Sequence, residues 1–148
     1  MKSAIDSGPA SQSPRISFSR KFSSSSKPSL CLAHEVDTYL WPESYKLVVQ
    51  YWFTPEAERN PGIIAKHKLG LLEELNFLEK EMRGDWLAGP LSIADFTLYP
   101  FLASMFRIEA KKEASLGISA ALPPKIAAWR KRFESLPYFQ KCLPPHWK

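Results

Sequence analysis

The sequence predicts an all-α fold, a bundle of five or six helices around one core. Apolar side chains recur at intervals of three and four residues in several segments after residue 30, which is the spacing of one helix face. Two helix starts carry capping residues, Asn60 before Pro61 and Ser92 three residues before Asp95. No segment alternates apolar and polar residues as a half-buried strand would. A chain of 148 residues buries about two-thirds of its unfolded surface, enough for one domain.

Residues 1–29 differ in composition from the rest and are expected to form a disordered tail before a helical domain at 30–148. The tail holds 11 serines and almost no large apolar side chains, so burial cannot offset the entropy of ordering it. Its serine and basic residues loosely resemble an organellar transit peptide, although Asp6 and the Gly8-Pro9 pair fit that class poorly. A simple extension, or the remainder of a lost upstream domain, is an equally good explanation. We expect a cytoplasmic protein, with an organelle as the alternative.

The first predicted helix runs from about Leu32 to Phe53. Its apolar residues fall at helical spacing: Val36, Leu40, Leu47, Val48, Tyr51 and Trp52. Pro42 should end or kink this helix near Trp41, because proline removes one N–H and clashes with the preceding turn. Thr54-Pro55 marks the exit, unless Thr54 caps a short turn that continues to Glu58.

The second predicted helix starts at Asn60-Pro61 and ends before Gly84. Asparagine is a favoured capping residue, and proline suits the first helical position because its missing N–H would have no partner there. One apolar stripe follows this helix: Ile64, Leu71, Leu75, Leu78 and Met82. We interpret the stripe as core rather than as a cofactor site.

The third predicted helix begins at Ser92, runs to about Glu109, and is apolar around most of its circumference, so it should be the buried central helix. Ser92 and Asp95 form a capping box, in which each side chain satisfies the backbone N–H of the other. This structural role is sufficient to explain Asp95. Pro100 leaves one carbonyl without its usual donor and should bend the helix.

A last amphipathic helix is expected after Pro123-Pro124, with Ile126, Trp129 and Phe133 on its inner face, and Pro137 ends it. Residues 138–141 suffice for one further turn. Pro144-Pro145 should then stop regular structure.

Charge and composition exclude several functional classes. Residues 1–29 carry a net charge of +4, and the remaining 15 basic and 14 acidic residues leave the domain at +1. The domain therefore lacks a surface suited to nucleic acid. Two cysteines and three histidines without ligand spacing predict no metal site, and reduced thiols rather than a disulfide. No apolar run reaches the about 20 residues of a membrane span. No glycine-rich phosphate loop, nucleophile motif or other catalytic residue stands out.

Three elements together resemble the C-terminal all-helical domain of the glutathione transferase superfamily. They are Trp86-Leu87-Ala88-Gly89, the capping box of Ser92 and Asp95, and Tyr99-Pro100-Phe101. The resemblance extends from about Leu30 to Leu143. It implies that the fold is a glutathione transferase C-terminal-like helical bundle.

The resemblance also implies where function would reside. Members of the superfamily carry a thioredoxin-like domain ahead of the helices, which supplies the catalytic Ser, Tyr or Cys and most of the glutathione site. Only 29 residues precede the helical part here, so we expect that domain to be absent and the chain alone to bind no glutathione and to conjugate none. By position in the family, the pocket for the small hydrophobic electrophile would be lined by Tyr45, Val49, Phe101, Ser104 and Met105. Packing in the core remains the alternative for these side chains.

Two other hypotheses remain open. Helical domains of this family also occur as non-catalytic assembly modules in translation elongation factor and aminoacyl-tRNA synthetase complexes. Loss of the thioredoxin-like domain would uncover an apolar face, which a second copy or another protein would then cover. The change in composition near Pro28 is also compatible with a truncated gene product that has no independent role.

Overall fold

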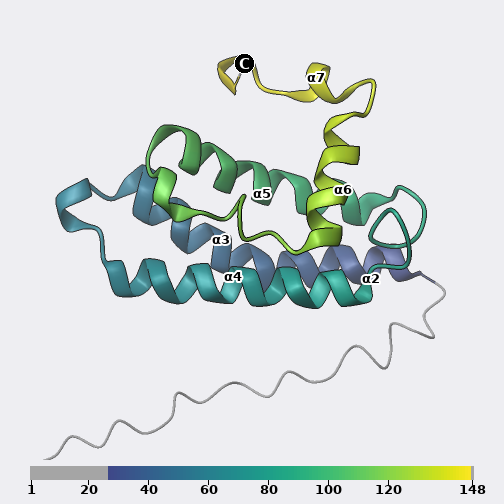
Figure 1. The fold of residues 1–148 in the computed structure, drawn as a ribbon, viewed down its shortest axis with the longest axis horizontal. Coiled ribbons are helices and arrows are strands. Elements are labelled where there is room, and N and C mark those ends of the chain that lie inside the picture. The colour runs from purple at the N-terminus through teal and green to yellow at the C-terminus, as the bar shows by residue number, and fades with distance from the viewer. Residues whose placement is uncertain (1–26, 148) are drawn as a thin grey trace, which may run out of the picture.

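The computed structural model describes residues 27–147, and its first feature is a long helical run from Pro28 to Phe53 (Figure 1). The run consists of α2 (Pro28–Glu35), the π-helical turn η1 (Val36–Leu40), α3 (Trp41–Val48) and the π-helical turn η2 (Val49–Phe53). The helix starts at Pro28, two residues before the predicted domain boundary. Residues 1–26, which hold most of the predicted tail, lie outside the described residues.

The helix predicted to end or kink near Trp41 instead continues past Pro42 through a change in hydrogen bonding. In η1 the Trp41 N–H donates to the Val36 carbonyl, five residues back rather than four. The wider turn lies directly ahead of Pro42, which occupies the second position of α3. A π-helical turn inserts one residue into the helix and so accommodates the missing N–H of the proline.

The second long helix, α4 (Pro61–Glu81), starts at the predicted cap. The Asn60 side-chain oxygen accepts from the N–H groups of Gly62 and Ile63, at 2.9 and 3.1 Å. A short 3-10 turn, η3 (Glu56–Glu58), precedes it; Pro55 rather than Thr54 stands at its start. Of the predicted apolar stripe, Leu71, Leu75 and Leu78 are fully buried, and Ile64 and Met82 pack against the core.

The central helix, α5 (Ile93–Lys111), begins with the predicted capping box. It continues through Pro100 to Lys111, two residues beyond the predicted end. Its buried residues lie on all sides of the axis, because α2 and α3 pack on one side and α6 on another: Ala94, Asp95, Leu98, Leu102, Ala103, Met105 and Ile108.

The rest of the chain covers α5 in short pieces. After the 3-10 turn η4 (Ala114–Leu116), α6 (Pro124–Glu134) crosses α5 and buries the predicted face of Ile126, Trp129 and Phe133 (Figure 1). Next come α7 (Phe139–Cys142) and the 3-10 turn η5 (Pro145–Trp147). The prediction that Pro144-Pro145 stops regular structure was therefore wrong, because Pro145 opens this last turn.

The architecture is the predicted all-α bundle, with α3 packed between α4 and α5 and one hydrophobic core that all the main helices share. Within residues 27–147 the backbone forms no β-strand beyond a single bridge between Trp86 and Gly89. Cys31 and Cys142 are both free thiols. No helix in this part of the chain is both long and apolar enough to cross a membrane.

Candidate functional site

Aromatic side chains from α3 and α5 meet on the surface where these helices run side by side. The ring centroid of Trp41 lies 5.1 Å from that of Tyr45 and 4.9 Å from that of Phe101. Trp41 and Tyr45 are one helical turn apart and so project from the same face of α3. Both rings are exposed, Tyr45 to 44%. We call Trp41, Tyr45 and Phe101 the aromatic cluster.

A groove of about 380 Å³ lies on the same two helices. Val48 and Ser104 each follow a member of the aromatic cluster by three residues, so the groove continues the cluster along α3 and α5. We call this feature the α3–α5 groove; its lining residues are Val48, Trp52, Phe53, Ser104, Arg107 and Trp147. Its volume falls within the range of small-molecule pockets.

The five side chains predicted to line a pocket are divided between surface and core. Tyr45 and Phe101 meet in the aromatic cluster, and Ser104 lines the groove, where its hydroxyl donates to the Pro100 carbonyl at 3.0 Å. Val49 is half-buried, but its neighbour Val48 forms the groove wall. Met105 is 0% exposed and belongs to the core.

Sequence reasoning missed the groove's cation and its aromatic neighbours. The Arg107 guanidinium carbon lies 5.3 Å from the centroid of the Trp52 ring and 4.9 Å from that of Trp147. Helical spacing does relate Trp41, Tyr45, Val48 and Trp52, so that stripe could have been found. Trp147 could not, because nothing in the sequence indicates that the C-terminal turn reaches α5.

A second cavity, of about 290 Å³, lies between α5, the end of α6 and the C-terminal segment. Its walls are almost entirely apolar, and the Tyr99 ring stacks on Phe133 with centroids 4.5 Å apart. Trp147 lines this cavity as well as the α3–α5 groove. The C-terminal turn therefore separates two neighbouring hollows along α5.

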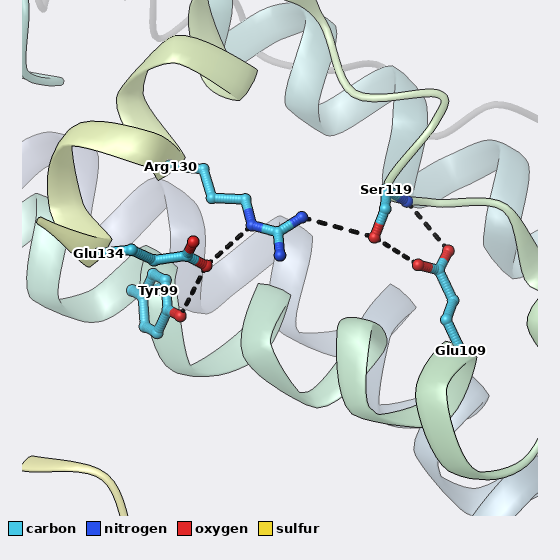
Figure 2. Close-up of polar contacts among 5 residues, drawn as sticks. All are labelled: Tyr99, Glu109, Ser119, Arg130 and Glu134. Carbon is cyan, nitrogen blue, oxygen red and sulfur yellow. Dashed lines mark hydrogen bonds and ion pairs between the residues drawn. The ribbon is translucent and has the colours of Figure 1, made fainter. Parts of the chain in front are cut away.

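Beside this cavity a chain of polar contacts joins α5, α6 and the segment that follows η4 (Figure 2). The Tyr99 hydroxyl and the Arg130 Nε both donate to Oε1 of Glu134, at 3.0 and 2.8 Å. Arg130 also reaches the Ser119 hydroxyl at 3.5 Å, and Ser119 donates from its backbone and its hydroxyl to the two oxygens of Glu109.

This polar chain has the properties of a structural link rather than of an acid or base. Burial, and then the neighbouring Glu134 carboxylate, raise the pKa of the Tyr99 phenol well above its usual range. A group that must exchange a proton near neutral pH needs a pKa close to neutrality. Tyr99 therefore remains a protonated donor that connects α5 to α6.

Asp95 is fully buried and connects three parts of the fold. Its Oδ1 accepts from the Leu87 N–H at 3.0 Å and from the Trp129 indole N–H at 2.8 Å. Its Oδ2 accepts from the Ser92 N–H at 2.8 Å and from the Ser92 hydroxyl at 3.1 Å. These four donors use the carboxylate fully, which supports the structural role expected from the sequence.

Other ionisable groups form local pairs. The Nδ1 of His67 lies 2.7 Å from Oε2 of Glu43, across the contact between α4 and α3. Hydrogen bonds from Ser115 lower the pKa of the Glu113 carboxyl. Burial, and then the Glu113 charge, raise the pKa of Tyr51. Within the described residues no three His, Cys, Asp or Glu side chains gather as a metal site would require.

Comparison with known proteins identifies relatives of this fold. The family model for the glutathione S-transferase C-terminal domain matches residues 61–132. The solved structure of glutathione S-transferase III in its apo form aligns with a TM-score of 0.62 and 25% sequence identity. The alignment covers 82% of this chain and 57% of that one, so the chain spans little more than half of the solved protein. A search of curated proteins found no match.

Proposed function

The described part of the chain is a C-terminal helical domain of the glutathione transferase superfamily, and from this premise we propose that it binds the hydrophobic co-substrate of a glutathione transferase-like protein. The proposed binding surface consists of the aromatic cluster and the adjoining α3–α5 groove. Tyr45, Phe101 and Ser104 are the predicted residues that contact the ligand, while Val49 and Met105 support the surface from the side and from below.

The observation that carries this proposal is the aromatic cluster itself. Exposed aromatic rings on a soluble domain bind planar apolar molecules well, because stacking removes apolar surface from water at little cost in side-chain entropy. Trp41 and Tyr45 are both exposed yet held by ring contacts to each other and to Phe101. The surface is therefore formed before any ligand arrives.

In the complete reaction the helical domain would contribute position rather than chemistry. Holding an electrophile in a fixed orientation against a reacting group can account for a large share of a rate enhancement. The thiolate of glutathione would be generated by a thioredoxin-like domain, as in the superfamily. We therefore propose that the 148-residue polypeptide taken alone binds the electrophile and leaves glutathione unconjugated.

The test is a fluorescence titration of the polypeptide with 4-nitrobenzyl chloride, a neutral aromatic electrophile. We expect saturable quenching, because Trp41 lies in the proposed surface. Tyr45→Ala should weaken binding about fivefold, the equivalent of one lost aromatic contact. Tyr39→Ala is the matched control, since Tyr39 is also exposed and precedes α3 in η1; it should change affinity less than about twofold.

Two results would contradict the proposal. Equal affinities of the Tyr45→Ala and Tyr39→Ala variants would show that the aromatic cluster does not bind the ligand. Added glutathione should produce conjugate no faster than in buffer, and turnover well above that rate would disprove the proposal that chemistry resides elsewhere.

A non-catalytic assembly module is the second candidate, and one observation favours it. Several large apolar side chains are exposed, including Phe53 at 75% and Leu69 at 60%. Such residues favour a protein partner when they form one continuous patch. Light scattering distinguishes the candidates, because an assembly module should associate with itself or a partner, whereas the binding domain need not.

A further inference from the structure

Arg107 is a cation without an acidic partner at the wall of an apolar groove. Its guanidinium lies close to two indole rings, at 5.3 Å from Trp52 and 4.9 Å from Trp147. Among residues 27–147 no carboxylate forms an ion pair or hydrogen bond with it. Its N–H groups therefore have no protein acceptor in the described part of the chain, although its position is fixed by the two rings.

A second positive charge strengthens the same local field. The Lys112 ammonium lies 5.0 Å from the centroid of the Trp52 ring, so one indole serves two cations. The nearest acidic residues along α5 and beyond are engaged elsewhere. Glu109 accepts from Ser119, and Glu113 accepts from Ser115. The groove thus combines apolar walls with an excess of positive charge.

The chemistry of a guanidinium indicates what would neutralise this charge. Its N–H donors form a planar fork that matches a carboxylate and binds it through two parallel hydrogen bonds. Contacts with aromatic rings orient such a fork without consuming its donors. The apolar walls from Val48, Trp52 and Phe53 would at the same time hold a hydrocarbon body.

We propose that the α3–α5 groove binds an apolar monocarboxylate, with the carboxylate paired to Arg107 and the apolar body between Trp52 and Phe53. This inference rests on the proposed function, since it names the class of ligand that the same surface prefers. Arg107 is the residue that determines this preference for a negative charge.

The test compares 2-naphthoate with 2-naphthamide, which share one ring system and differ in charge. We expect the unmodified polypeptide to bind the carboxylate about tenfold more tightly than the amide at low salt. Arg107→Gln should abolish that difference by weakening only 2-naphthoate. Added salt should reduce the preference, since part of this charge attraction is screened.

Two variants control for charge and geometry. Lys111→Gln removes one positive charge from the next turn of α5 at an exposed side chain outside the groove, and it should retain most of the preference. Arg107→Lys keeps the charge but loses the fork, and it should give an intermediate value. Far-UV circular dichroism of each variant establishes that the helices are intact.

The outcomes separate this inference from the proposed function. Equal affinities of the unmodified chain for the two naphthalene probes, with 4-nitrobenzyl chloride still bound through Tyr45, would overturn the inference alone. Loss of the preference in Lys111→Gln as well as Arg107→Gln would also overturn it, since only net charge would then matter. Absence of binding by all three probes would overturn both proposals.

Discussion

Asp95 shows how one buried side chain can fix the relative positions of several segments. The segment before α5, the cap of α5 and the Trp129 side chain of α6 all donate to its two oxygens. A buried carboxylate is tolerated only when its acceptor capacity is used, and here it is used by four donors. The same residue type at a helix cap would be replaceable if it bonded only to Ser92.

We predict that Asp95→Asn lowers the free energy of unfolding by about 3 kcal/mol, although the amide has nearly the same shape. An amide has a single acceptor oxygen, so one pair of donors would face its NH₂ group inside the core. Asp85→Asn is the matched control, because Asp85 is exposed and its ion pair with Arg132, at 2.9 Å, should contribute no more than about 1 kcal/mol. Urea unfolding followed at 222 nm measures both; equal losses would contradict the role assigned to Asp95.

Tyr99 leads to a prediction about alkaline pH. The folded state keeps this phenol protonated where the unfolded chain ionises it, near pH 10. The unfolded state then binds fewer protons, so the stability of the fold falls as pH rises above about 10.

The variant Tyr99→Phe tests this linkage. It should cost about 1 kcal/mol at neutral pH through loss of the hydrogen bond to Glu134. Above pH 10 the gap between the unmodified chain and the variant should narrow, because only the former has this phenol to ionise on unfolding. Chemical unfolding at pH 7, 9, 10 and 10.5 measures the gap, and a constant gap would refute the argument.

At the scale of elements, the contact between α3 and α4 is unusually close at Gly70. A Cβ placed on Gly70 would lie 2.5 Å from Oε2 of Glu43, the oxygen that pairs with His67. Glycine inside a helix costs about 1 kcal/mol relative to alanine. The glycine of α4 therefore gives up helix stability and leaves room for the ion pair between the helices.

A double-mutant cycle tests this compensation. Gly70→Ala should be close to neutral in the unmodified chain, because its helix propensity gain is offset by displacement of Glu43 from His67. In a Glu43→Ala background the same change should stabilise the protein by about 1 kcal/mol. Equal effects in both backgrounds would mean that Glu43 moves aside without cost.

The helices that the sequence predicted well are those with local chemical signals. Asn60 and Ser92 cap α4 and α5 because their side chains satisfy N–H groups only two or three residues away, a relationship contained in the sequence itself. The π-helical turns at η1 and η2 were not predicted. Pro42 marks a disturbance in either case, and whether a helix stops, bends or widens there depends on packing against other helices.

At the scale of the molecule, the candidate site was only partly accessible from the sequence. Positions carried over from the family placed Tyr45, Phe101 and Ser104 on the surface between α3 and α5, where the structure has them. Arg107 was missed because a cation on a helix is ordinarily a solvated side chain. Its significance arises only when Trp52 and the distant Trp147 meet it in space.

The widened turn at η1 has a consequence for the evolution of this chain. Each residue of a helix turns the backbone by about 100°, so deletion of one residue between Val36 and Leu40 would restore ordinary winding and rotate everything beyond it. Trp41 and Tyr45 would then point away from α5, and the ligand surface would be dismantled without any of its residues having been changed. Length in this short stretch is thus as much under constraint as residue identity, and natural variants should tolerate substitutions there far better than deletions.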